Sequence, residues 1–171
     1  MRAVTYHPIG DAHHCVFRLM ALLGTIPEQG YKIDRLRIMD FYFLFPSLLK
    51  KMKRTQSLRT AMSKCQSSLF KDPFQILPSK KILFNQMSTV QFAAINHLLS
   101  KGVIEYGSFQ TGIVRLNVKS DGFDLSLKFK KLSDHNELLE LITNEFLLID
   151  LFGPNGLKHR SGLLEFRYDT L

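Results

Sequence analysis

Asp40 is the residue of this sequence whose setting most suggests chemistry. It stands in the run Met-Asp-Phe-Tyr-Phe, among side chains that are otherwise apolar. Burying a carboxylate is costly unless it has a partner, so we expect Asp40 either to act in catalysis or to pair with a positively charged group. A catalytic interpretation makes it a general acid or base. A structural interpretation pairs it with Arg37 or another arginine, or places it at a subunit contact, and we favour the structural interpretation.

Potential metal ligands cluster at one place, which holds His7, His13, His14 and Cys15. His13 and His14 are adjacent, so on a helix their side chains diverge by about 100° and do not simply chelate one ion. Cys15 falls on the apolar face of a predicted helix, where a cysteine is usually inert, and Cys65 has basic neighbours but no evident catalytic partner. We therefore predict no metal site and no cofactor.

Motifs that bind phosphates through glycine-rich loops are absent from the sequence. The glycines are scattered, and none lies in a GxxxxGK[ST] or GxGxxG pattern. Together with the lack of an assembled nucleophile, this predicts a protein that is not an enzyme. We expect the purified chain to show no nuclease, hydrolase or ATPase turnover.

The positive charge of the chain is concentrated in one stretch. The net charge is +8, and the stretch from Lys50 to Lys81 holds nine lysines and arginines against Asp72 alone, so it accounts for the whole excess. Such a surface suits contact with phosphates, although a solvated basic loop would have the same composition. The candidate phosphate contacts are Lys50, Lys51, Lys53, Arg54, Arg59 and Lys64.

Length and composition indicate one folded domain. The chain has 171 residues, 45% of them apolar and 22% charged, with fourteen Phe, no Trp and two Cys. So few cysteines favour a reducing cytoplasm over a disulfide-stapled secreted domain. Polar and charged residues interrupt the N-terminal region where a signal peptide would be apolar, and no window approaches the roughly 20 apolar residues of a membrane span.

Two helices are predicted in the N-terminal third. The first runs from 12 to 23, with Asp11 as its cap and Gly24 as its stop. The second runs from 34 to 45, carries two apolar stripes and ends at Pro46, before a short helix over 47–52. Two stripes need cover, either from the core or from another protein. The hypothetical partner-binding residues are Phe41, Tyr42, Phe43 and Phe45.

The remainder alternates between helical and extended patterns. Residues 55–79 suit a linker, a mobile loop or a weak helix around 58–69, and Ser88 with Gln91 forms a capping box for a helix that ends at Gly102. The other predicted elements are strands over 103–106, 113–118, 123–129 and 163–168, a helix opened by Ser133, Asp134 and Glu137 that runs to 152, and a turn over 153–156.

These patterns predict an α+β fold, a helix-turn-helix or winged-helix-like domain with a small antiparallel sheet. The chain divides into a helical part over 1–54, a basic connecting segment over 55–80 and a winged-helix-like part over 81–171.

The first fifty residues resemble a known family. The elements that carry the similarity are Tyr-His-Pro at 6–8, Asp11, His14, Phe-Arg-Leu at 17–19 and the run DRLRIMDFYFLFP at 34–46. They are similar to the small middle components of bacterial ABC-three-component systems, the group that includes Lamassu-type antiphage defence operons. Four residues of this run match the family's motif: Asp34, Arg35, Asp40 and Pro46. The resemblance implies that they either define the fold or act in function.

The resemblance implies a role between partners. Such proteins are adaptors between a large SMC-like ATPase and an effector, often a nuclease, in a complex that senses foreign DNA. The alternative is a winged-helix DNA-binding protein or transcriptional regulator. Against it, the helix over 89–101 offers few long polar donors for reading bases: Gln91, Asn96, His97 and Lys101.

Overall fold

The first helix begins and ends at the residues predicted to cap it. The computed structural model describes residues 8–26, 28–72, 77–132 and 136–165. After the 3-10 turn η1 (Pro8–Gly10), α1 (Ala12–Leu23) begins at Asp11, whose carboxylate accepts a hydrogen bond of 2.9 Å from the amide of His14. Gly24 follows the last turn, so the predicted helix and both of its ends are confirmed.

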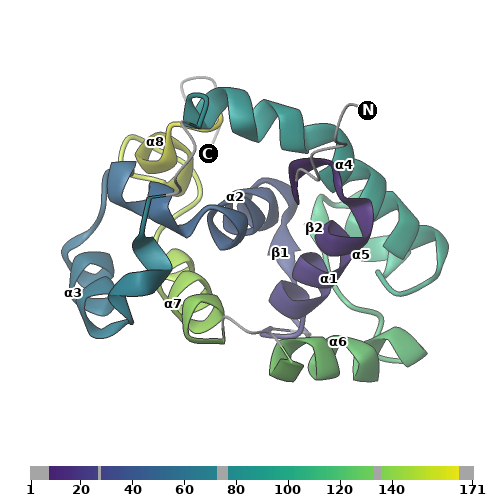
Figure 1. Cartoon of the computed structure of the whole chain (residues 1–171). Helices are drawn as coiled ribbons and strands as arrows, with labels where there is room; N and C mark the ends of the chain where they lie inside the picture. Colours follow the sequence, from purple (N-terminus) through teal and green to yellow (C-terminus); the bar gives the residue numbers. More distant parts are fainter. Residues whose placement is uncertain (1–7, 27, 73–76, 133–135, 166–171) are drawn as a thin grey trace, which may run out of the picture.

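Helix α2 (Ile33–Leu44) lies at the centre of the molecule, as its two apolar stripes predict. Figure 1 shows it surrounded by α1, α4 (Lys80–Ser100) and α7 (Asn136–Leu147). The ring of Phe41 packs on Phe84 of α4, with centroids 5.7 Å apart. On another side, Tyr42 meets Phe146 of α7 edge to face, also at 5.7 Å. The chain itself therefore covers both stripes.

Residues 46–70, which include the first part of the basic stretch, are mostly helical. They form two 3-10 helices, η2 (Pro46–Lys51) and η3 (Ser67–Phe70), on either side of α3 (Gln56–Lys64). Thr55 caps α3 by accepting from the amide of Leu58 at 3.1 Å, and Leu58 is buried. Of the three structures predicted for residues 55–79, the helix around 58–69 is therefore confirmed.

Helix α4 begins much earlier than its predicted capping box. Ser79 caps it through the amide of Ile82, at 3.4 Å, so Ser88 and Gln91 lie in the middle of the helix. The capping box is wrong because the polar side chain of Gln91 is fully buried and bonded to Arg37 and Asp40 of α2. The predicted end is confirmed: Gly102 follows the helix with φ +70°, which favours glycine.

The sheet joins segments that are distant in the sequence. β1 (Tyr31–Lys32) pairs antiparallel with β2 (Ile113–Val114). The expected partner of β2, the segment 103–106, contributes only the isolated bridge between Ile104 and Leu116, and α5 (Tyr106–Gln110) follows it. Within the described residues the fold is mostly helical with this small two-stranded sheet.

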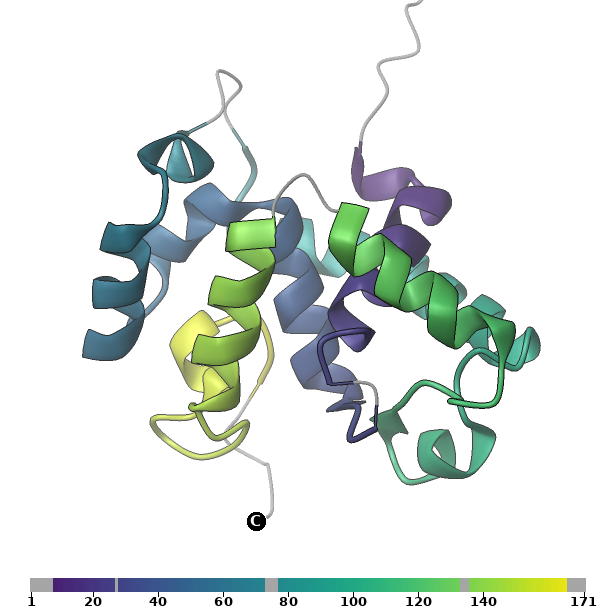
Figure 2. The same cartoon turned by 90° about the horizontal axis from the view of Figure 1, so that it is seen from below.

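The predicted strand over 123–129 is wrong, since α6 (Asp121–Leu132) occupies these residues. Figure 2 shows α6 crossing α1, and the crossing depends on small residues. The hydroxyl of Ser126 donates to the carbonyl of Met20, and a Cβ on Gly24 would lie 2.9 Å from the same hydroxyl oxygen. The alternation of Phe and Leu with polar residues over 123–129 predicted a strand and gave no sign of this close contact between two helices.

The C-terminal part is built from α7, a turn and α8 (Leu157–Ser161). The turn over 153–156 is confirmed by the bond from the amide of Gly156 to the carbonyl of Gly153, at 3.0 Å. Helix α7 ends before the predicted residue 152, and its predicted opening residues, Ser133 and Asp134, lie outside the described residues. Residues 163–165 do not form the predicted strand, and 166–168 lie outside the described residues.

Buried apolar side chains from residue 9 to residue 163 form one continuous cluster. In the part of the chain that the structure describes, every helix is too short or too polar to span a bilayer.

Candidate interaction surfaces

The aromatic residues predicted to bind a partner lie mostly in the core. Phe41 and Tyr42 have no exposed surface, and Phe43 is buried too. Phe45 is half-buried, with its ring 5.4 Å from that of Phe41. As a correction to the sequence analysis, Phe41 packs against α4 and Tyr42 against α7, and Phe43 is buried with them, so these three rings are not exposed to a partner. Phe45 stays a predicted partner contact.

Asp40 is fully buried and paired with an arginine, as the structural interpretation predicts. Arg18 of α1 donates to both carboxylate oxygens, from Nε at 2.6 Å and from NH2 at 3.2 Å. The amide of Gln91 on α4 donates to Oδ2 at 2.8 Å. The carboxylate therefore joins three helices, and its partner is Arg18 rather than Arg37.

Arg37 extends this network toward the surface. Its Nε donates to Oε1 of Gln91 at 3.1 Å, and its NH2 donates to Ser88 at 2.8 Å. The guanidinium lies over the rings of Phe84 and Phe92, at 4.9 and 4.6 Å from their centroids. The polar groups of the network thus satisfy one another, which is the arrangement of a structural bridge rather than of an open acid–base site.

Cys15 and His14 flank the same carboxylate without forming a reactive pair. Burial, followed by the nearby charge of Asp40, raises the pKa of the Cys15 thiol, so it stays protonated and weakly nucleophilic. The Nδ1 of His14 lies 2.9 Å from NH1 of Arg18. Because a guanidinium only donates, this nitrogen is the acceptor and the ring is neutral. Among the described residues no three potential metal ligands gather.

The contact between His14 and Arg18 predicts acid sensitivity. Burial and the charge of Arg18 lower the pKa of His14, so below its ordinary value of about 6.5 the unfolded chain binds the proton more readily. The contact thus stabilises the fold fully above that value and less as the pH falls through the folded pKa. We expect acidification to lower the melting temperature of the wild type more steeply than that of His14→Gln, measured by circular dichroism. Equal slopes would contradict the prediction.

The six predicted phosphate contacts fall on two different surfaces. Lys50, Lys51 and Lys53 are exposed at the end of η2 and just after it, with Arg54 half-buried beside them. Arg59 and Lys64 are exposed on α3, and Lys64 lines a groove against α7 together with acidic side chains, namely Glu137, Glu140 and Glu145. The two α3 cations therefore do not extend the η2 surface.

Two later segments join the η2 surface: the start of α4, whose Lys80 belongs to the predicted basic stretch, and residues 158–160, which the sequence analysis missed. The amide of Lys53 donates to the carbonyl of Arg160 at 3.0 Å, and the Arg160 guanidinium donates to the carbonyl of Lys53 at 3.2 Å. The Nζ of Lys53 lies 3.0 Å from Nε2 of His159. The Nζ of Lys80, at the start of α4, donates to the carbonyl of Lys51 at 3.3 Å. The run of three basic residues at 158–160 was the feature of the sequence that could have indicated this part of the surface.

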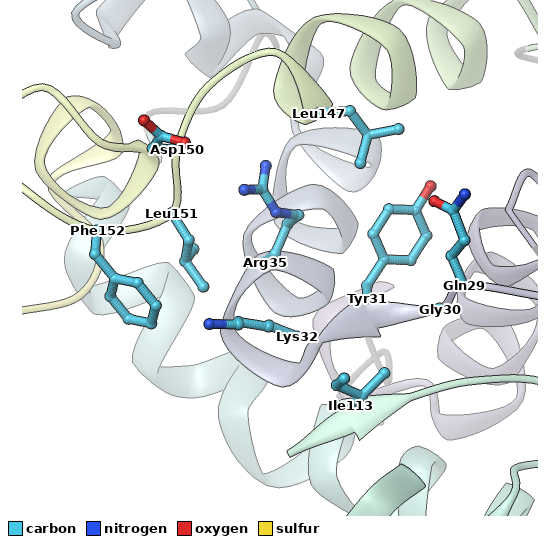
Figure 3. Close-up of a pocket in the computed structure, with 10 residues that line it drawn as sticks. All are labelled: Gln29, Gly30, Tyr31, Lys32, Arg35, Ile113, Leu147, Asp150, Leu151 and Phe152. Atoms are coloured by element: carbon cyan, nitrogen blue, oxygen red, sulfur yellow. The ribbon is translucent and has the colours of Figure 1, made fainter. Parts of the chain in front are cut away.

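A pocket of about 430 Å³ lies between β1, the start of α2 and the loop after α7. In Figure 3 the guanidinium of Arg35 points toward this loop, where it donates to the carbonyls of Phe146 and, at 2.9 Å, of Ile149. The Nζ of Lys32 lies 4.6 Å from the centroid of the Phe152 ring. Arg35 thus caps the end of α7, and the pocket combines cations with apolar walls.

Two exposed leucines border this pocket. Leu147 is 42% exposed and lines it, and Leu148 is 74% exposed and lines the adjoining hollow around the loop before α8. Exposed leucines next to each other at a concave surface are a common feature of protein–protein contacts. The two leucines form a candidate partner surface among the described residues, alongside the predicted contacts on α2.

Residues 4–169 match the family described as ABC-three component (ABC-3C) system Middle Component 5. No curated protein and no solved structure matches the chain.

Proposed function

The chain belongs to the family of ABC-three component system Middle Component 5, and on this premise we propose that it is a non-catalytic adaptor subunit. Membership of a multi-component system implies protein partners, and it is the observation that carries the proposal. The partners we propose are an SMC-like ATPase and an effector, a nuclease, in a bacterial defence complex of the Lamassu type directed against phages or plasmids. The place of action we propose is the cytoplasm.

The state of the reactive side chains supports a non-catalytic role. The carboxylate of Asp40 is occupied by Arg18 and Gln91. Its neighbour Cys15 is buried, and burial raises the pKa of the thiol. Neither group is presented to a substrate in the pocket of Figure 3. The chain would thus contribute binding surfaces to the complex, while its partners carry out the chemistry.

The alternative function, a winged-helix regulator that reads DNA bases, has less support. The helix expected to enter the major groove is the second half of α4, and Gln91, its best base-reading side chain, is buried against Asp40. The exposed polar residues that remain on this half are mainly Asn96, His97 and Lys101. Such a surface has no arginine to make a bidentate contact with guanine.

The adaptor role is tested by co-expression of this chain with the proposed partners, an SMC-like ATPase and an effector. We expect the three proteins to co-purify, and we expect the ATPase and effector to separate when this chain is omitted. The measurement is size-exclusion chromatography with light scattering. An ATPase–effector complex that forms equally well without this chain would contradict the adaptor role, and so would a chain that binds neither protein.

A further inference from the structure

Cationic side chains from three distant segments meet at one edge of the molecule. The segments are the end of η2, the first turn of α4 and helix α8, and Figure 1 shows α8 beside the start of α4. A Cβ on Gly162 would lie 3.5 Å from Nζ of Lys80, which confirms that these two segments touch. We call this surface the basic corner; its residues are Lys51, Lys53, Lys80, His159 and Arg160.

Backbone contacts hold the basic corner in shape. The guanidinium of Arg160 donates to the carbonyls of Lys53 and Asn155, so it is fixed in place while its NH2 group is not used in those bonds. The ammonium of Lys80 is likewise anchored on the carbonyl of Lys51. These carbonyls are neutral acceptors. They orient the cations but leave their charge uncompensated.

Within the described ranges, the lysines and the arginine of the corner are not neutralised by carboxylates in ion pairs. Of the ion pairs found in the described part of the chain, none includes Lys51, Lys53, Lys80 or Arg160. Burial and the charge of Lys53 lower the pKa of Lys80. Burial, Lys53 and Arg160 lower the pKa of His159. Neighbouring cations thus add to the effect of burial on both pKa values, and a bound polyanion would offset this repulsion.

We propose that the basic corner binds the phosphate backbone of nucleic acid without reading its bases. Ammonium groups and a guanidinium at fixed positions are the usual phosphate ligands, and binding releases the counterions condensed on the polyanion. An acidic protein surface is the competing ligand. It is less favoured because protein interfaces surround such charges with apolar side chains, whereas Ile82 is the one large exposed apolar residue of these segments in the described chain, and Arg160 alone also lines the hollow that holds Leu148. The proposal goes beyond the adaptor role and does not depend on it.

A matched pair of charge reversals tests the proposal on the full chain. Lys51→Glu with Lys53→Glu alters the corner, whereas Arg59→Glu with Lys64→Glu makes the same change of net charge on α3. The four replaced side chains are exposed. The probe is a dye-labelled DNA duplex of arbitrary sequence, followed by fluorescence anisotropy over a range of salt concentrations. Thermal melts confirm that both variants are folded.

We expect the corner variant to raise the Kd for the duplex by about tenfold or more at low salt, and to reduce the salt slope by about 0.9 for each phosphate that is no longer neutralised. The α3 variant should stay close to the wild type, and changing the duplex sequence should not matter. Absence of binding by the wild type at low salt, or equal rises of Kd in both variants, would overturn the proposal. Binding to poly-glutamate in preference to DNA would assign the corner to an acidic protein and overturn it too.

Discussion

Replacing Asp40 with alanine is expected to lower the free energy of unfolding by about 3–5 kcal/mol. The loss arises because Arg18 and Gln91 keep their buried positions while their shared acceptor disappears. A cation left unpaired in the core is far more costly than the net value of the original pair. Urea denaturation followed by circular dichroism measures the change.

The control removes both charges together. In the double variant Arg18→Met with Asp40→Leu, apolar side chains replace the pair, and most of the stability lost in Asp40→Ala should return. Retention of wild-type stability in Asp40→Ala would show that the network contributes little. If that stable variant had also lost a measurable turnover of the wild type, the catalytic interpretation of Asp40 would have to be restored.

Phe41 and Leu148 should respond in opposite ways to substitution. Phe41 has no exposed surface and packs on three aromatic rings, so Phe41→Ala should destabilise the chain by about 3–5 kcal/mol through loss of burial and a cavity. Leu148 is 74% exposed, so Leu148→Asp should leave the melting temperature near the wild-type value. Instead, it should weaken binding to a partner subunit by about 10- to 100-fold, which corresponds to the burial of one leucine.

Leu125 provides the matched control for this comparison. It is 44% exposed on α6, away from the pocket of Figure 3, so Leu125→Asp should alter neither stability nor partner affinity. Binding by isothermal calorimetry, with the ATPase and the effector tested separately, identifies which partner uses Leu148. Unchanged affinity of Leu148→Asp for both would remove the leucine pair from the interface.

Helix ends were predictable where one residue determines them. Asp11 caps α1, Gly24 and Gly102 follow helix ends, and Pro46 ends α2, because each has a local effect on backbone bonding or conformation. Tertiary context decided the failures. Ser88 and Gln91 have the spacing of a cap, but their side chains are taken by Arg37 and the network around it.

The strand predicted over 123–129 failed for a related reason. Its alternation of large apolar and polar residues suits a strand, but the feature that decides the packing is the small side chain of Ser126 against α1. Small residues produce no hydrophobic period, so pattern analysis gives them little weight. The same holds for Gly24, whose importance for the α1–α6 contact appears only when the two helices are brought together.

The candidate surfaces were predictable only in part. The basic character around Lys53 was evident in the sequence, but its association with Arg160 results from the fold. The aromatic run of α2 was correctly predicted to need cover, and the sequence could not show that α4 and α7 supply it. Both questions concern contacts between distant segments, on which a local pattern carries no information.

The motif residues of the family resemblance have structural roles in this chain. Asp34 accepts from Lys158 at 2.9 Å, Arg35 caps the end of α7 and Asp40 binds Arg18. Each links α2 to another helix or to the loop beyond one. The run of residues 34–46 therefore supplies the polar contacts that fix α2 against the elements around it.

The contacts of α2 also set an order of events during synthesis on the ribosome. Its polar bonds to α1 and α4 are complete once the nascent chain extends through Gln91. The other side of α2 is covered only after Phe146 has been synthesised, and β1 can pair only after β2 has been synthesised. Until the last helices leave the exit tunnel, a half-finished chain presents the apolar face of its central helix to the cell. The cover of the central helix is complete only when Phe146 has emerged from the tunnel and can meet Tyr42.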